Sequence, residues 1–302
     1  MIGIDWGTTS FRAYRLRGRA VLDRVALPLG ISSIAAGGFP RALEGAVAPW
    51  LADGERRILM SGMVGSRQGW VEAPYLPCPA ATADLARALL PVPFGPAEVL
   101  LVPGLSAADP AGVPEVMRGE EVQILGALGT APGDAQGDMP KSTMVCLPGS
   151  HSKWARVAGG RVEGFSTHLT GEAFAALSGH TILGRLMQAD APSDPDAFRR
   201  GVLRSADPGG LLHHLFGVRT LSLFDRLPEA AASSFLSGLL IGHEVRAAAP
   251  ASPVLLIGAA ALCALYSQAI TLCGGSATLA DGEAAAQGLA SIGEAAWTSR
   301  NS

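Results

Sequence analysis

Two short turns in the sequence combine small residues, hydroxyls and a cation in the same order. The first is Gly7-Thr8-Thr9-Ser10 followed by Arg12, and the second is Gly149-Ser150-His151-Ser152 followed by Lys153. Tight turns of this composition expose backbone N–H groups and hydroxyls, which bind anions, and a nearby cation adds positive charge. Either turn alone is more typical of an ordinary hairpin. The pair, each with its cation, favours binding of a phosphate chain.

Asp5 stands just before the first turn, at the end of an apolar stretch. A carboxylate in this position could hold Mg²⁺ directly or through water, because a hard cation on phosphates needs few carboxylates. The alternative is that Asp5 caps its own loop. The sequence contains neither GxxxxGK[ST] nor a strand–GxGxxG–helix unit, so it predicts neither a P-loop nor a Rossmann site.

Strands and helices must position these turns, and the apolar pattern alternates between the two along the whole chain. Strands are expected at 1–5, 12–16, 20–26, 57–61, 98–102, 143–147 and 254–257, and helices at 40–51, 81–90, 115–128, 171–187, 196–205, 230–249 and 282–296. This alternation predicts an α/β architecture with a mixed or parallel sheet. The Gly- and Pro-rich stretch 103–114 is the best candidate for a domain boundary, and a second such loop covers 129–140.

The sequence also repeats itself. Residues 2–16 and residues 144–157 each consist of an apolar strand, a hydroxyl-rich turn, a cation and a second strand, after which a Gly-containing turn leads into a third strand. Two copies of one unit, near the start of each half, suggest a duplicated, two-lobed protein.

Composition limits the classes of function. The 302 residues predict about two domains of ~150 residues, and 48% hydrophobic residues suffice for a large core. A net charge of −3 with 16% charged residues argues against a nucleic-acid partner. The four cysteines form no CxxC pair, so we expect reduced, mostly buried thiols. Asp5 interrupts the apolar run that a signal peptide needs, and the longest apolar run, 254–265, is shorter than a membrane span of ~20 residues. We therefore expect a cytoplasmic protein without membrane contacts.

Several motifs along the chain resemble those of a known protein family. Residues 1–12 resemble the first phosphate motif of the actin/hexokinase/Hsp70 superfamily. Gly62-Met-Val-Gly-Ser-Arg-Gln-Gly-Trp70, with the blocks 117–126, 147–154 and 166–172, resembles the 2-dehydro-3-deoxygalactonokinases over essentially the whole chain. The resemblance implies an α/β, two-lobed actin-like ATPase (ribonuclease H-like) fold with duplicated domains and an ATP/sugar cleft between them. The expected lobes are 1–114, with the first phosphate loop and the sugar-acid loop, and 115–302.

The resemblance implies an activity and a nucleotide site. The activity is ATP- and Mg²⁺-dependent phosphorylation of the 6-hydroxyl of 2-dehydro-3-deoxy-D-galactonate in bacterial galactonate breakdown. Two alternatives stay open: a kinase of another sugar or sugar acid on the same fold, and a non-catalytic nucleotide-binding switch, for whose extra domain 302 residues leave little room. The implied nucleotide-binding residues are Asp5, Gly7, Thr8, Thr9, Ser10, Arg12, Gly149, Ser150, His151, Ser152, Lys153, Gly258 and Ala259, with Asp5 also the metal ligand. The last two lie where relatives carry Gly-Gly, whereas this chain has one glycine.

Phosphoryl transfer also needs a carboxylate to accept the hydroxyl proton. Related carbohydrate kinases place an Asp after a small residue at a helix start. Here the run is Arg118-Gly119-Glu120-Glu121, which offers two glutamates in its place. Glu120 directly follows the glycine and is slightly favoured, while first-turn glutamates also suit the helix dipole.

For the substrate carboxylate the sequence offers Arg67, whose planar fork reads carboxylates well. Gln68, Trp70 and Tyr75 would complete a surface suited to a polyol, and the alternative is a packed loop with Arg67 paired to Glu72. Glu172 is equally consistent with a helix start or a site residue, His151 and His168 are more typical of structural hydrogen bonds, and His213 and His214 are expected on a solvated helix face. A homodimer remains an option.

Overall fold

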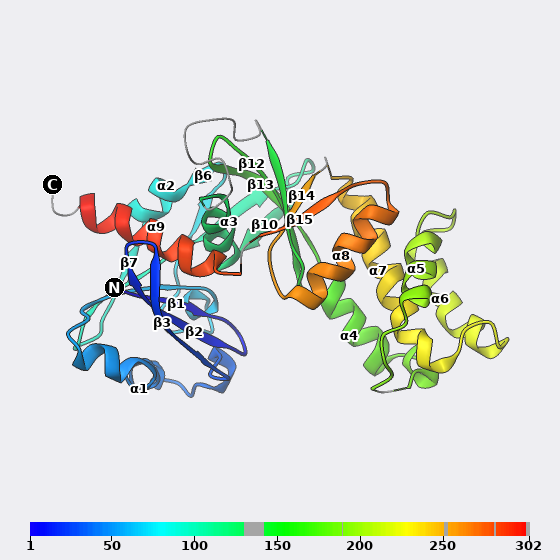
Figure 1. Cartoon of the computed structure of the whole chain (residues 1–302), viewed down its shortest axis with the longest axis horizontal. Coiled ribbons are helices and arrows are strands. Elements are labelled where there is room, and N and C mark those ends of the chain that lie inside the picture. Colours follow the sequence, from blue (N-terminus) through cyan, green and yellow to red (C-terminus); the bar gives the residue numbers. More distant parts are fainter. Residues whose placement is uncertain (130–141, 189, 251–252, 281, 300–302) are drawn as a thin grey trace. The chain divides into compact units, whose positions relative to one another are not determined.

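The computed structural model describes residues 1–129, 142–188, 190–250, 253–280 and 282–299 (Figure 1). The chain divides into two compact units. The first comprises residues 1–142, 156–165 and 280–302, and the second comprises 143–155 and 166–279. This division confirms a protein of two lobes. It does not follow the expected boundary at residue 114, because the chain returns to the first unit twice.

The main sheet of the first unit has the strand order β3-β2-β1-β4-β8-β7. Its strands are β1 (Ile2–Trp6), β2 (Phe11–Arg17), β3 (Ala20–Leu27), β4 (Arg57–Ser61), β7 (Leu90–Val92) and β8 (Glu98–Leu101). β1, β2 and β3 form an antiparallel meander, whereas β4 runs parallel to β1 and β8 runs parallel to β4. Asp5 therefore pairs with Ser61 where two parallel strands end, which is where open α/β sheets place ligands.

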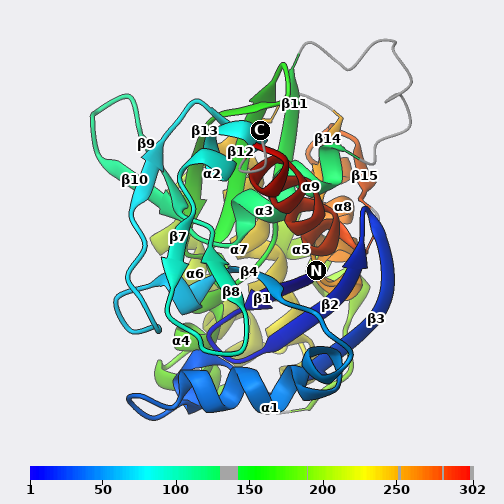
Figure 2. The ribbon, with the colours of Figure 1, turned by 90° about the vertical axis from the view of Figure 1, so that its left-hand side faces the viewer.

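Strand β1 is buried on both faces. Ile2, Ile4 and Trp6 alternate into a core that they share with α1 (Phe39–Ala52), and each side chain is fully buried. Burying such an apolar side chain contributes roughly 1.5–3 kcal/mol. On the opposite face, a Cβ at Gly3 would lie 3.1 Å from Leu289 of α9 (Ala284–Ser299). Figure 2 shows α1 and α9 on opposite faces of this sheet.

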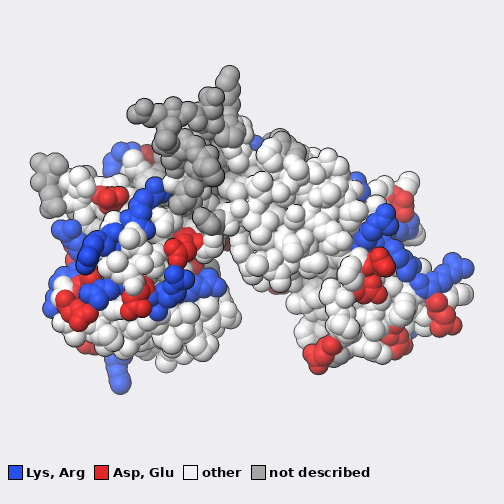
Figure 3. Space-filling model, viewed as in Figure 1, with Lys and Arg blue, Asp and Glu red and all other residues white. Residues whose placement is uncertain are grey.

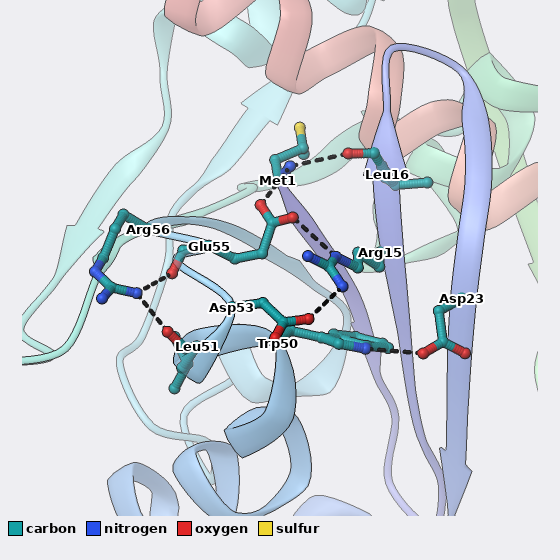
Figure 4. A network of polar contacts seen from close by, with 9 residues as sticks. All are labelled: Met1, Arg15, Leu16, Asp23, Trp50, Leu51, Asp53, Glu55 and Arg56. Carbon is teal, nitrogen blue, oxygen red and sulfur yellow. Dashed lines mark hydrogen bonds and ion pairs between the residues drawn. The ribbon is translucent and has the colours of Figure 1, made fainter.

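A polar network fixes the chain at the start of β1 (Figure 4). The Met1 amine donates to the Leu16 carbonyl over 2.9 Å and pairs with Glu55 at 3.1 Å. Arg15 joins Glu55 to Asp53 through contacts of 2.9 and 2.8 Å. These bonds hold the amino-terminal end of β1, and Asp5 lies at its other end.

A smaller sheet, β10-β9-β5, changes the expected element order. It is formed by β5 (Tyr75–Pro77), β9 (Gly104–Ala108) and β10 (Pro114–Met117). The stretch 103–114 is therefore no linker, because it contains a strand and the hairpin turn to the next one. The helix expected from residue 115 begins only at Glu120, as α3 (Glu120–Leu128). Gly119 separates strand from helix with a φ of +105°, a conformation that favours glycine.

Close helix packing explains why α3 and α9 belong to the first unit. A Cβ at Gly126 would lie 1.9 Å from the Ala284 carbonyl oxygen, and one at Gly288 equally close to that of Val122. Glycines at both positions let the two helix backbones touch. The same unit contains α2 (Thr82–Arg87) and β6 (Ala80–Ala81), which pairs with residues 161–162 of β13 (Arg161–His168).

The second unit repeats the strand pattern of the first. The sheet that contains its strands follows the order β15-β14-β11-β12-β13-β6, with β11 (Thr143–Leu147), β12 (Ser152–Ala158), β14 (Val254–Leu256) and β15 (Ala277–Leu279). β14 runs parallel to β11 and β15 parallel to β14, as β4 and β8 do beside β1. The internal repeat of the sequence is thus confirmed as a repeat of topology.

The second unit also contains the helices α4 (Thr170–His180), α5 (Pro195–Arg204), α6 (Gly210–Leu223), α7 (Ala232–Ala248) and α8 (Ala260–Leu272). One-turn 3₁₀ helices lie at Ile31–Ser33, Met63–Gly65, Gly184–Leu186 and Glu229–Ala231. The expected helix 171–187 ends at His180, and the apolar run 254–265 is a strand followed by the start of α8. The second predicted loop, 129–140, lies almost wholly outside the described residues.

Both signs of charge are intermixed on the face of the first unit drawn in Figure 3. A surface that binds nucleic acid is typically a stripe of one sign. Among the described residues, no helix is long and apolar enough to cross a membrane.

Candidate active site

The first predicted phosphate turn joins β1 to β2 and is held in place by residues 30–32 of the following loop. The Gly7 N–H donates to the Ser10 carbonyl over 2.8 Å, which closes the turn. The Ser32 N–H and hydroxyl both donate to the Thr8 carbonyl, at 3.1 and 2.7 Å. A Cβ at Gly30 would lie 2.2 Å from that same oxygen. Thr8 and Thr9 remain exposed, so their hydroxyls are available to a ligand.

Asp5 occupies a largely enclosed position beside this turn. Its side chain is 12% exposed, and Oδ2 lies 3.4 Å from Arg12 Nη1. Burial raises the pKa of Asp5, and the neighbouring Arg12 guanidinium opposes that rise. A divalent cation would oppose it further, because positive charge favours the carboxylate form.

Two glycines bring further segments to Asp5. Gly62 has a φ of +93°, and a Cβ there would lie 3.3 Å from Asp5 Oδ1. A Cβ at Gly119 would in turn lie 3.1 Å from the Gly62 Cα. The end of β1, the loop after β4 and the start of α3 therefore converge within the first unit, and no side chain fills the space at either glycine.

The two candidate bases differ in their environments. Glu121 is fully buried, and the Gly119 N–H donates to both of its carboxylate oxygens, at 2.9 and 2.7 Å. Burial, reinforced by the negative charge of Glu120, raises the pKa of Glu121 to about 8. Glu120 is half-buried, and its Oε2 accepts from the Arg118 N–H over 2.9 Å. Glu121 anchors the glycine turn and is enclosed, whereas Glu120 is the more accessible of the two carboxylates.

Arg118 is a site residue that the sequence did not single out. It is 7% exposed, its Nη2 donates to the Ala73 carbonyl over 2.7 Å, and its guanidinium lies 4.3 Å from the ring centroid of Tyr75. Nε and Nη1 have no hydrogen-bond partner among the described residues. Arg118 thus ties the loop 62–75 to the start of α3. Its position directly before Gly119 was the available signal.

The predicted sugar-acid loop presents some of its residues and packs others. Arg67 is 82% exposed, and its Nε lies 3.4 Å from Glu72, so the pairing considered as the alternative is present. An exposed pair of this kind contributes little stability. Gln68 is also exposed. Trp70, expected as an open aromatic surface, is instead partly buried and stacks on Phe39 with ring centroids 6.1 Å apart.

The second predicted phosphate turn joins β11 to β12 in the second unit. Ser150 and His151 are exposed, whereas Ser152 and Lys153 are buried. The Lys153 ammonium donates to the Thr167 hydroxyl over 2.9 Å. The Ser152 hydroxyl is bonded inside the protein, at 2.8 Å from the Tyr266 hydroxyl. Ser152 therefore holds the turn from inside the protein, whereas the sequence predicted that it contacts the phosphates directly.

Helix α4 begins against this second turn. A Cβ at Gly171 would lie 2.5 Å from the Gly149 carbonyl oxygen, so only glycine allows the approach. The Glu172 N–H donates to the Ser150 carbonyl over 3.1 Å, and its carboxylate contacts His151 Nε2. The structure therefore brings Glu172 and His151 together at the turn.

A cavity of about 480 Å³ opens beside the same turn. Its walls include Gly149, Ser150, Gly171, Ser237, Leu262 and Tyr266, so it combines apolar surface with hydroxyls. This volume lies within the ~300–1,000 Å³ of small-molecule sites. A Cβ at Gly258 would lie 3.6 Å from the Pro148 carbonyl oxygen, and Ala259 directly precedes α8, of which Leu262 and Tyr266 line the cavity. The region expected to bind adenosine and the second turn are therefore neighbours.

Some polar residues lie elsewhere than expected. His214 is fully buried, not solvated: its Nδ1 lies 3.0 Å from His243 Nε2, and its Nε2 lies 3.1 Å from the Pro208 carbonyl oxygen. His213, its neighbour, is exposed as expected. The four cysteines are free thiols, of which Cys146 and Cys263 are buried.

Comparison with solved structures shows the fold. The activator of 2-hydroxyisocaproyl-CoA dehydratase from Clostridium difficile, solved with ADPNP bound, aligns with a TM-score of 0.51 at 11% identity and covers 100% of this chain and 97% of its own. A candidate 2-dehydro-3-deoxygalactonokinase from Sinorhizobium meliloti aligns with a TM-score of 0.89 at 37% identity, covering 98% and 99% of the two chains. With its repeated sheets, this chain has the fold of the actin-like ATPase superfamily.

Sequence comparison is more specific. The model of the 2-keto-3-deoxy-galactonokinase family matches residues 5–292. The 2-dehydro-3-deoxygalactonokinase of Escherichia coli is 33% identical over 299 residues, which is 97% of each chain. A Rhizobium meliloti protein provisionally assigned the same activity is 38% identical over 306 residues, 97% of this chain and 96% of its own. The chain belongs to the 2-keto-3-deoxy-galactonokinase family.

Proposed function

We propose that the chain is a kinase that transfers the γ-phosphoryl group of ATP to the 6-hydroxyl of 2-dehydro-3-deoxy-D-galactonate. Family membership supports the substrate class. The observation that carries the chemistry is the convergence of Asp5, Gly62 and the start of α3 in the first unit. One metal-competent carboxylate, an open loop and a reachable Glu120 are what phosphoryl transfer to an alcohol requires.

In this proposal Asp5 holds Mg²⁺. The donor set fits a cation that keeps most of its waters, because one largely enclosed carboxylate lies beside exposed threonines and above a glycine that leaves room. When bound, Mg²⁺ neutralises phosphate charge. Thr8, Thr9 and Arg12 bind phosphate oxygens from the same turn.

Glu120 accepts the proton of the acceptor hydroxyl. The hydroxyl oxygen then forms its bond to the γ-phosphorus while the bond from that phosphorus to the β-bridging oxygen breaks, and ADP leaves. A positioned general base contributes about 10²–10⁴-fold. Glu121 keeps the Gly119 turn in place and does not touch the substrate.

For the nucleotide we propose that the adenosine occupies the cavity of about 480 Å³ and that the exposed residues of the second turn, Ser150 and His151, contact phosphates. At the substrate end, Arg67 and Gln68 bind the carboxylate and hydroxyls, with Tyr75 beside them. Because the donor is ATP, we place the reaction in the cytoplasm.

The test is direct transfer. Purified protein with Mg²⁺-ATP and 2-dehydro-3-deoxy-D-galactonate should yield ADP and a monophosphate whose ³¹P signal couples to the protons on carbon 6. Glucose, N-acetylglucosamine and the acid's uncharged reduced analogue serve as competing acceptors. Faster transfer to a neutral hexose would replace the sugar acid as substrate, and ATP binding without transfer to any acceptor would support a nucleotide switch instead.

A further inference from the structure

A buried carboxylate lies behind the second phosphate turn and has no assigned role. Glu244, on α7, is 3% exposed. It accepts hydrogen bonds from Trp154 Nε1 at 2.7 Å and from the Tyr266 hydroxyl at 2.6 Å. The Ser152 hydroxyl lies 3.4 Å from Glu244 and 2.8 Å from the Tyr266 oxygen. Three elements, β12, α7 and α8, therefore meet at one carboxylate.

The alternation of side chains along β12 shows which residues of the turn this network holds. Side chains alternate along a strand, so Ser152 and Trp154 point to one face of β12 and Lys153 points to the other. Glu244 and Tyr266 thus hold the residues on either side of Lys153, whose ammonium bonds Thr167. Any rotation of the strand at this point would break these contacts together. The network fixes both the exit of the turn and the orientation of its cation.

The energetics of burying Glu244 favour a positioning role for this residue over a stabilising one. Among the described residues, no cation forms an ion pair with Glu244. Enclosing a carboxylate is costly unless strong donors replace its water, and here neutral N–H and O–H groups do so. Replacing a buried polar group and its partners together by apolar groups of the same shape can be nearly neutral or stabilising. A buried, hydrogen-bonded residue such as Glu244 is useful where its bonds specify one conformation of the loop.

The network also reaches the nucleoside cavity. Tyr266 lines the 480 Å³ cavity with Ser150, while Glu244 borders a separate cavity of about 350 Å³ with His168 and His243. Burial and the adjacent Glu244 raise the pKa of Tyr266, so its hydroxyl keeps the proton that it donates. One side chain therefore faces the nucleoside and holds the phosphate turn at once.

We propose that Glu244 is a positioning residue for ATP: through Tyr266, Ser152 and Trp154 it holds the second phosphate turn in the conformation that binds nucleotide. This inference rests on the proposed nucleotide role of that turn. It assigns to Tyr266 the coupling between the nucleoside cavity and the phosphate turn. Neither residue touches the sugar acid.

The test uses Tyr266→Phe, which keeps the ring in the cavity and removes only the hydroxyl, together with Glu244→Gln. Ser205→Ala is the matched control, because Ser205 also carries a buried hydroxyl, which donates to the Val202 carbonyl over 2.7 Å, and it lies outside both the network and the cavity. We expect Tyr266→Phe to raise the KM for ATP, and the Kd of a non-hydrolysable ATP analogue in calorimetry, by roughly tenfold. The KM for the sugar acid should change less than twofold, and Ser205→Ala should leave the affinity for the analogue within about threefold.

A merely structural role predicts a different pattern, in which the melting temperature falls while the KM for ATP of the folded enzyme stays within twofold of wild type. That result, or an equal rise in both KM values, would overturn the proposal. Should Glu244→Gln fail to fold, Tyr266→Phe decides alone. Calorimetry with the analogue needs no turnover, so the inference can be tested even if wild type transfers no phosphate to the sugar acid.

Discussion

Glu121 should make the stability of this protein depend on pH near neutrality. Its carboxyl group is fully buried, and burial raises its pKa from an ordinary value near 4.5 to about 8. Between these values the folded state holds a proton that the unfolded chain has released. The stabilisation is therefore fully present below about pH 4.5 and is lost as pH rises through about 8.

The size of the effect follows from the same interval. At about 1.4 kcal/mol per pH unit, the step from 4.5 to about 8 corresponds to a loss of roughly 5 kcal/mol across the range. This is a large part of the 5–15 kcal/mol that typically stabilises a folded domain. Glu121→Gln keeps the shape and one oxygen that can accept from the Gly119 N–H, but it cannot ionise, so its contribution should not change with pH.

Urea denaturation at pH 5.0 and 8.5 measures the effect. The difference in free energy of unfolding between the two pH values should shrink by several kcal/mol in Glu121→Gln relative to wild type. Glu163→Gln, at an exposed position of β13, is the matched control and should behave as wild type. If Glu121→Gln and wild type differ between the two pH values by the same amount within 1 kcal/mol, Glu121 is ionised in the folded state and the reasoning fails.

Three further predictions concern activity. Asp5→Asn should keep the fold and lower kcat/KM by a factor equivalent to a few kcal/mol; a near-normal kcat at saturating Mg²⁺ would contradict the metal role. Glu120→Gln should lower kcat by about 10²–10⁴-fold with an unchanged Kd for ATP, while Glu121→Gln should cost less, and a reversed order would move the base to Glu121. Arg67→Ala should raise the KM for the sugar acid and spare its uncharged analogue, with Arg67→Lys recovering part of the loss; equal losses toward both acceptors would show that Arg67 only holds its loop.

The sequence predicted the parts of the fold that local pattern determines. Strands 57–61 and 143–147 are found with the expected bounds, and the repeat of strand, turn and strand corresponds to a repeat of sheet topology. The helix expected over 115–128 was wrong at its start. Residues 114–117 pair with β9 in a hairpin, and this strand pairing outweighs the helical spacing of the apolar residues.

The sequence also identified turn residues that are exposed in the structure, but not the groups that support the two turns. Thr8, Thr9 and Ser150 are open, as residues of binding turns should be. Trp154 and Glu244, by contrast, are 90 positions apart in the chain, and their contact exists only after β12 and α7 have packed. The sequence alone does not predict this hydrogen bond, because a glutamate within an apolar helix pattern is equally consistent with a solvated position.

The adjacent glutamates show most clearly what three dimensions add. In the sequence both stand in the first turn of one helix, and the dipole argument applies equally to each. Successive residues on a helix point about 100° apart, so one carboxylate can face the core while its neighbour does not. Glu121 turns inward and binds the N–H of Gly119, the residue whose positive φ brings α3 against Gly62. A base must exchange its proton with a bound hydroxyl, and a carboxyl group without exposed surface, such as that of Glu121, cannot reach one. The burial of Glu121 is therefore the physical reason for assigning the proton to Glu120.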